Sequence, residues 1–266
     1  MRKVGALVRA AWLTALSYRL QSFFSFVGLI VAVLPLYFIT GALQPLMQGV
    51  IKTEAPEYFG YLIVGIVTFT FVQTAVGAMH GALGGEISTG SFEALLATPT
   101  SIPTLLAGMI GQAFTMTAFR AVVILAAAMV LGAKLALSGV IPALLALVLI
   151  VASYLPFGIV AAALVLGFRT TGPFPGLILT GSALFGGVYY PTQVIPSWLE
   201  RVSTFIPLTY GLRALRRSLL DGAPLSASIF DLGVLCVATA VMLALSLAAF
   251  SWTMRYAKRA GTLAQY

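Results

Sequence analysis

Six apolar stretches, each close to the length of a bilayer crossing, follow one another along this chain of 266 residues. They cover residues 23–40, 58–80, 104–131, 140–166, 174–190 and 232–254. A helix needs about 20 apolar residues to cross the hydrocarbon core of a bilayer. The sequence therefore predicts an all-α polytopic membrane protein with six transmembrane helices. Because no water-soluble domain fits between the stretches, we expect a single membrane domain over 1–266.

The composition supports this class and argues against others. Apolar residues make up 60% of the chain and charged residues only 8%, against about 25% in soluble domains. The net charge of +8 suits contact with anionic lipid headgroups better than nucleic-acid binding, because no basic stripe interleaved with aromatic residues occurs. The one histidine, His80, and the one cysteine, Cys236, are too few for a His/Cys metal site or a disulfide framework.

Residues 1–21 combine basic and apolar side chains at helical spacing. Arg2, Lys3, Arg9 and Arg19 stand among apolar residues that repeat every three or four positions. This pattern is typical of an amphipathic helix in the headgroup plane rather than of a cleaved signal. A charged flank of the first span is the alternative.

The distribution of basic residues predicts the orientation. Basic residues before the first span indicate a cytoplasmic N-terminus, and six crossings return the C-terminus, with Arg255, to the same side. Residues 44–57 then form the first outer loop, and Arg169 lies inside. Four arginines between the fifth and sixth spans fall outside and oppose this assignment: Arg201, Arg213, Arg216 and Arg217.

The segment 84–99 is too polar to cross a bilayer. As a helix it would place Glu86, Gly90 and Glu93 on one face at i, i+4 and i+7, and Pro99 would end it. It follows the second span, so it is predicted to be cytoplasmic. A short surface helix with a carboxylate face suggests docking to a partner outside the membrane.

Two short amphipathic helices are predicted within 191–221. Pro196 and Pro207 stand at the expected first positions of these helices. Neither helix is apolar enough to cross, so we expect a partly re-entrant or interfacial cap on the outer side. An ordinary surface loop with aromatic anchors is the alternative.

No energy source for transport is visible in the chain itself. A nucleotide-binding loop needs a Gly-Lys pair, and none of the four lysines follows a glycine. No acidic residue lies inside a predicted span, so a proton- or sodium-coupled carrier lacks its titrating group. A serine protease arrangement is also missing, and we expect no catalytic activity. The simplest explanation is that a separate subunit supplies the energy and binds this chain through residues 84–99.

Two polar features within the spans are candidates for a substrate path. Arg120 is the only charge well inside a predicted span, and such a residue is functional unless it snorkels to an interface. Thr70, Gln73, Thr74 and Gly77 share one face of the second predicted span. Small and weakly polar residues of this kind also promote helix packing in lipid, which is the alternative interpretation.

Several motifs together resemble one known family. They are Glu86-x-x-x-Gly90-x-x-Glu93-x-Leu95-Leu96-x-Thr98-Pro99, Gly187-Val188-Tyr189-Tyr190-Pro191, Pro196-x-Trp198, and Pro207-Leu208-Thr209-Tyr210 followed by Arg213. In this order they resemble the permease subunit of type 2 ABC transporters, particularly the drug- and lipid-exporter branch that includes daunorubicin-resistance permeases. Ser91 departs from the pattern, because relatives often carry a basic residue or threonine there.

The resemblance implies that 84–99 is a coupling helix seated on an ATP-binding subunit. The residues implied in that contact are Glu86, Gly90, Phe92, Glu93, Leu96, Thr98 and Pro99. Those implied in the outer cap are Tyr189, Tyr190, Pro191, Pro207 and Arg213. Two permeases, expected to be identical, and two ATPases would form the exporter, with ATP and Mg²⁺ held by the partner and no cofactor by this chain.

The predicted function is the outward movement of a drug, lipid or lipid-linked molecule, including antibiotic efflux, driven by a partner's ATP cycle. The predicted location is a bacterial cell membrane, with both termini in the cytoplasm. The alternatives are an ATP-independent channel or lipid scramblase, a membrane scaffold, and a polysaccharide-exporting permease, whose N-terminal signature is not found here.

Overall fold

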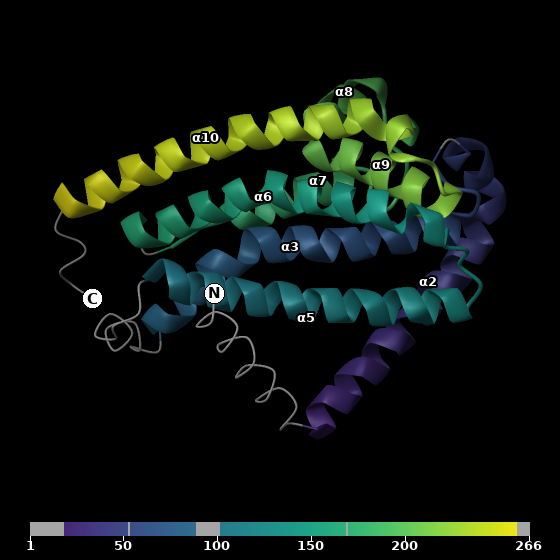
Figure 1. Ribbon diagram of the computed structural model, residues 1–266, viewed down its shortest axis with the longest axis horizontal. Coiled ribbons are helices and arrows are strands. Elements are labelled where there is room, and N and C mark those ends of the chain that lie inside the picture. The colour runs from purple at the N-terminus through teal and green to yellow at the C-terminus, as the bar shows by residue number, and fades with distance from the viewer. Residues whose placement is uncertain (1–18, 53, 89–101, 169, 260–266) are drawn as a thin grey trace.

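The computed structural model describes residues 19–52, 54–88, 102–168 and 170–259, and all regular structure in these ranges is helical (Figure 1). Short 3₁₀ turns at Leu137–Gly139, Thr192–Val194 and Leu225–Ser228 lie in three of the connections. The eight α-helices are α2 (Arg19–Ile51), α3 (Tyr58–Ser88), α5 (Ile102–Val130), α6 (Val140–Phe168), α7 (Phe174–Phe185), α8 (Ser197–Ser203), α9 (Pro207–Asp221) and α10 (Ile229–Arg259).

Five of the helical segments are long and apolar enough to cross a bilayer. They are Phe26–Ile51, Tyr58–Gly81, Ile110–Val130, Leu137–Val165 and Leu225–Thr253. Each overlaps one of the predicted stretches, so the all-α, multi-pass membrane fold expected from the sequence is confirmed. The last segment also includes Asp231, which the sequence places just before the predicted span.

In the fifth predicted stretch, 174–190, the helix is shorter than the apolar stretch. Its helix, α7, has 12 residues and is about 18 Å long, short of the ~30 Å hydrocarbon core. The helix ends at Gly186, and Gly187 then adopts a φ of +80°, which breaks the helical path. A crossing by this segment, and with it the count of six, therefore stays a prediction.

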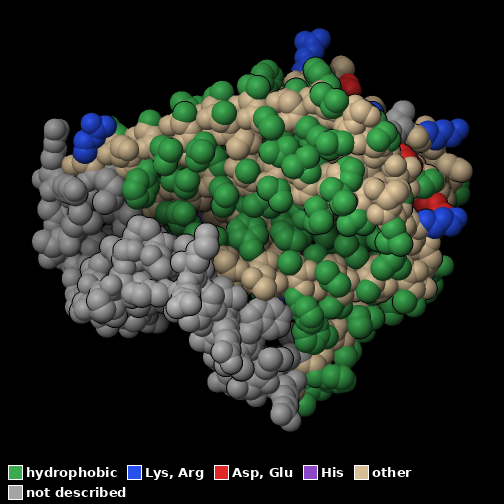
Figure 2. Space-filling model, in the orientation of Figure 1, with side chains coloured by type: hydrophobic (Ala, Val, Ile, Leu, Met, Phe, Trp, Pro, Cys, Tyr) green, Lys and Arg blue, Asp and Glu red, His purple; other side chains and the backbone are tan. Residues whose placement is uncertain are grey.

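The long helices lie side by side, with α3 and α6 in the middle (Figure 1). α10 covers one side of α6, α5 lies along α3, and α2 crosses beside α3 and α5. One core of buried side chains joins α3 to α6 and α9, and a second joins α2, α3 and α5. On the face seen in Figure 2, hydrophobic side chains are spread over the described surface between the two ends of the bundle, as expected of a protein surrounded by lipid.

The connections gather at opposite ends of the bundle. Residues 52, 54–57, 131–139 and 187–228 lie at one end, which we call the cap end (the right side of Figure 1). α3 and α6 finish at the other end, and α5 starts there. The helices within 191–221 are not an ordinary surface loop, because α9 packs back against α6 and α10. The partly re-entrant or interfacial character of this cap, and the outward orientation of the cap end, stay predictions.

One predicted boundary is wrong, and another falls within a helix. The first outer loop is not 44–57, because α2 continues to Ile51. The Gln44 side chain accepts a hydrogen bond of 2.7 Å from the Tyr58 backbone N–H at the start of α3. α3 in turn runs through Gly84 and Gly85 to Ser88, so the segment 84–99 begins as part of α3.

Candidate functional site

A hollow of 670 Å³ opens between α2, α3 and α5. Its walls combine polar and apolar side chains, with one residue from α2 and the rest from facing sides of α3 and α5. The lining residues are Leu29, Thr70, Gln73, Thr74, Gly77, Ala78, Gln112, Ala113, Met116, Thr117, Arg120 and Ile124.

Threonine hydroxyls hold the two main walls together. The Thr74 and Thr117 hydroxyl oxygens lie 2.7 Å apart and share a hydrogen bond between α3 and α5. The Thr70 hydroxyl donates to the Val67 carbonyl one turn earlier. Such bonds fix the threonine side chains, so the polar wall has a defined shape before any ligand arrives.

Arg120 lies at the middle of this wall. It lies within α5 (Ile102–Val130), 18 residues after the first residue of the helix and ten before the last. The charge is therefore inside an otherwise apolar helix, about 15 Å along its axis from the cap end. The residue is exposed, and within the described part of the chain no ion-pair partner accompanies its guanidinium.

The structure brings all four sequence-predicted path residues, Thr70, Gln73, Thr74 and Arg120, to this one hollow. It adds α5 residues that sequence reasoning missed: Gln112, Ala113, Met116, Thr117 and Ile124. A signal was available, because Gln112, Met116 and Arg120 recur every four residues and so share one helix face.

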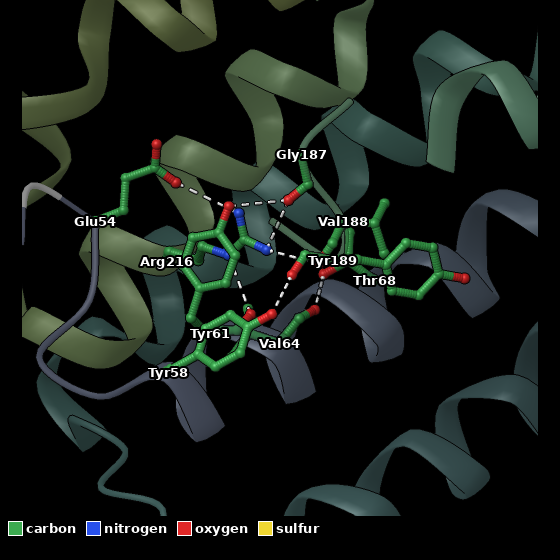
Figure 3. A network of polar contacts seen from close by, with 9 residues as sticks. All are labelled: Glu54, Tyr58, Tyr61, Val64, Thr68, Gly187, Val188, Tyr189 and Arg216. Carbon is green, nitrogen blue, oxygen red and sulfur yellow. Dashed lines mark hydrogen bonds and ion pairs between the residues drawn. The ribbon is translucent and has the colours of Figure 1, made fainter. Parts of the chain in front are cut away.

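A second polar centre surrounds Arg216 at the cap end (Figure 3). Only 1% of Arg216 is exposed. Its Nη1 donates to Glu54 at 3.3 Å, its Nε to the Tyr61 carbonyl at 3.2 Å, and its Nη2 to two further carbonyls. The guanidinium carbon also lies 3.3 Å from the centre of the Tyr61 ring, a cation–π contact.

This network satisfies the backbone where α7 ends. The carbonyls of Gly187, Val188 and Tyr189 follow the helix and have left its hydrogen-bond pattern. Arg216 Nη2 donates to the first two at 2.9 and 3.1 Å, and the Tyr61 hydroxyl also donates to the first at 3.1 Å. The Tyr58 hydroxyl donates to the third at 2.9 Å. Irregular backbone in a membrane protein requires such partners.

Two more arginines of α9 pair with one carboxylate. Arg213 and Arg217 lie 3.4 and 3.6 Å from the two carboxylate oxygens of Asp231. Asp231 stands in the first turn of α10, where the helix dipole favours a negative charge. The pairs attach α9 to α10. Lys134 and Glu57, 3.2 Å apart, form an exposed pair nearby, which contributes little.

The residues predicted for the outer cap all lie at the cap end. Pro191 is buried and precedes the 3₁₀ turn Thr192–Val194, and Pro207 is the buried first residue of α9. The Tyr189 side chain is exposed, and the Tyr189 carbonyl accepts the hydrogen bond from the Tyr58 hydroxyl. Arg213 joins the Asp231 pair. Tyr190 is half-buried, with no role the structure explains.

Arg216 and Glu54 are the cap residues that sequence reasoning did not select. On α9, Leu208, Leu212, Arg216 and Leu220 recur every four residues and all are buried. The spacing alone would have placed Arg216 on the apolar face. Its partner Glu54 lies 162 positions away, and no local pattern indicates that pairing.

The predicted coupling contact is largely outside the described residues. Glu86 lies in the last turn of α3. Gly90, Phe92, Glu93, Leu96, Thr98 and Pro99 lie outside the described ranges, as do 1–18 of the predicted N-terminal amphipathic helix. Among the residues that are described, no group of three or more His, Cys, Asp or Glu side chains is placed to hold a metal ion.

Comparison with protein families decides what kind of membrane protein carries these features. The family model of the ABC-2 type transporter matches residues 2–220. The chain belongs to this family. ABC-2 membrane domains are transmembrane transport components that work with ATP-binding subunits, so this chain is a transmembrane subunit of an ABC-type transporter. A comparison with curated protein sequences found no match.

Proposed function

We propose that this ABC-2 chain is the permease of an ATP-driven exporter, and that it moves a hydrophobic or amphiphilic substrate from the cytoplasm or inner leaflet outward. The observation that carries the proposal is the hollow between α2, α3 and α5. It combines polar and apolar side chains within the candidate spans, the mixed lining that an amphiphile needs.

The energy comes from a partner. In this proposal, two ATP-binding subunits hold ATP and Mg²⁺, and residues 84–99 form the coupling helix that seats on them. Their closure on ATP moves the coupling helices and rearranges the spans of two identical permeases. Glu86, at the end of α3, lies on the helix that carries Thr70, Gln73 and Thr74, so a push at that end is transmitted along a rigid element to the hollow.

The orientation follows from the same scheme. The end of the bundle where α3 and α10 finish faces the cytoplasm of a bacterial cell, and the cap end faces outward. The Arg216 network supports different roles for the two ends. Its hydrogen bonds fix the structure of the cap end, while the opposite end binds the ATPase. The predicted drug- and lipid-exporter branch is part of this proposal.

Glu93→Arg tests the coupling directly. The charge reversal should abolish substrate-stimulated ATP hydrolysis by the co-purified ATP-binding subunit and leave the amount of permease in the membrane unchanged. Glu200→Arg, a matched reversal in α8, should leave the stimulation intact. Equal stimulation in wild type and Glu93→Arg would contradict the assignment of 84–99 as the coupling segment.

A further inference from the structure

We propose that the hollow between α2, α3 and α5 binds the anionic headgroup of the substrate, and that Arg120 is the residue that selects for negative charge. The inference rests on the proposed function, since it names the class of amphiphile that the exporter would carry. The headgroup chemistry is a phosphate, sulfate or carboxylate attached to an apolar body.

The charge of the hollow is the first argument. Among the described residues that line it, Arg120 is the one charged side chain, and none is a carboxylate. The described acidic residues near the cap end, such as Glu54 and Asp231, are already paired with other arginines. A cation without a counter-charge favours an anion and repels a cationic ligand.

Comparison with Arg216 is the second argument. Arg216 is buried and directs its donors to four protein oxygens. Arg120, inside a candidate span, has no such set of acceptors among the described residues, although an arginine carries five N–H donors. A charged side chain within a span is costly in lipid. A ligand oxygen in the hollow would supply the missing acceptors.

The remaining lining fits an amphiphile. Gln73 and Gln112 add amide N–H donors to the polar wall, while Leu29, Met116 and Ile124 offer apolar contacts for a chain or ring. The volume of 670 Å³ lies within the range of small-molecule sites, about 300–1,000 Å³. A singly charged amphiphile fits both the apolar bundle and the polar wall.

Binding to the full permease with its ATP-binding partner, in phosphatidylcholine nanodiscs without nucleotide, tests the proposal. The probe is fluorescent dodecyl phosphate, measured by polarisation, with dodecyltrimethylammonium and dodecyl maltoside as competitors of equal chain length. Dodecyl phosphate itself should compete, and the other two should not. Arg120→Gln should weaken probe binding about tenfold or more, because a charge-assisted hydrogen bond is lost.

Matched variants separate recognition from structure. Arg120→Lys, which keeps the charge, should retain most of the binding, and Arg120→Glu should shift the preference toward the ammonium competitor. Arg201→Gln removes an exposed charge at the cap end and should leave binding unchanged. Equal affinity of wild type and Arg120→Gln, or loss of binding in Arg201→Gln alone, would overturn the proposal.

Two further arms identify the source of the anion and its access to the hollow. Phosphatidylglycerol in the nanodisc competes if the ligand is a lipid headgroup; competition by dodecyl phosphate alone indicates a non-lipid amphiphile, and either result supports an anion site.

In a Cys236→Ala background, Gln73→Cys should react with a membrane-permeant maleimide. Complete protection would show that another protein surface, such as a second copy, fills the hollow, and would overturn the proposal.

ATP-dependent transport of the same probe keeps the two proposals distinct. Charge-selective binding without ATP-dependent transport supports the anion site and contradicts the exporter. Transport that does not discriminate dodecyl phosphate from dodecyltrimethylammonium contradicts the anion site and leaves the exporter standing.

Discussion

Arg216 and Arg120 are the same residue type in one bundle, and their surroundings give them different roles. Arg216 is enclosed by α3, α9 and the chain after α7, with an acceptor for each of its three nitrogens. Arg120 lies at the wall of an open hollow. A buried charge whose donors are satisfied fixes structure, whereas the donors of an exposed arginine inside a candidate span are available for a ligand.

Arg216→Met should destabilise the protein strongly, by about 3–5 kcal/mol, because it leaves Glu54 as an uncompensated buried charge and removes the donor to the Gly187 and Val188 carbonyls. Glu54→Gln should cost less, since the glutamine amide oxygen can still accept from Arg216, which also keeps its three carbonyl acceptors, and only the charge of the pair is lost. The measurement is thermal unfolding of the purified protein in detergent. Equal melting temperatures for Arg216→Met and Arg201→Met, an exposed site, would contradict the role of the network.

Gly65→Ala should also lower the stability of the cap end. A β-carbon at Gly65 would collide with the Val188 carbonyl oxygen and lie 2.7 Å from Arg216 Nη2, so the backbone that these groups hold would have to shift. Gly81→Ala, in the same helix with open space around it, should be neutral or stabilising by up to about 1 kcal/mol. The melting temperatures of the two variants check this order, and the reverse order would count against the packing described.

α9 is the element that makes the cap end part of the bundle. Its buried face packs against α6, α10 and α3, and the Ala136 N–H donates to the Leu219 carbonyl at 2.8 Å. Close approach needs small residues: Gly139 meets the Ser218 backbone, and Gly211 meets the Ile150 side chain. Because α9 has a buried face with these close contacts, it packs among the spans although it is too polar to cross the bilayer.

Gly211→Ala should loosen the contact between α9 and α6, because the added methyl group overlaps Ile150, by about 1–3 kcal/mol. Ile150→Ala in the same molecule should recover part of that loss by making space, so the two changes should be non-additive in a double-mutant cycle of unfolding free energies. Gly233→Ala in α10, where nothing lies within 4 Å, serves as the control. Strict additivity would show that the two residues do not touch.

The elements differ in how well the sequence predicts them. Long spans such as 58–80 and 140–166 are predictable, because apolar length alone decides them. α7 is not, since its apolar stretch continues to Tyr190 while Gly187 breaks the helix. What replaces the helix is a set of hydrogen bonds from α3 and α9, and partners so distant in sequence leave no local signal.

At the scale of the whole molecule, the site was predictable only in part. Thr70, Gln73 and Thr74 are recognisable as one face of a span, and Arg120 as a rare charge within another. That the two faces meet depends on α3 lying beside α5, with Thr74 against Thr117. Membership in the ABC-2 family supports the motif-based resemblance.

The orientation of the bundle gives a prediction for the whole chain. Ser226, exposed in the turn Leu225–Ser228 at the cap end, should react as Ser226→Cys with a membrane-impermeant maleimide added outside intact cells, in a Cys236→Ala background. Arg255→Cys, exposed beyond the candidate span at the far end of α10, should not react under the same conditions. Labelling of Ser226→Cys only after the cells are opened would place the cap end in the cytoplasm.

The central claim is that transport through this permease is driven by a partner's ATP cycle. The most direct measurement is the movement of fluorescent dodecyl phosphate across proteoliposomes that contain the permease with or without its ATP-binding subunit. We predict net movement only with both proteins, Mg²⁺ and hydrolysable ATP, and none with a non-hydrolysable analogue. Movement of equal rate and extent without ATP would contradict the account and favour a passive channel or scramblase.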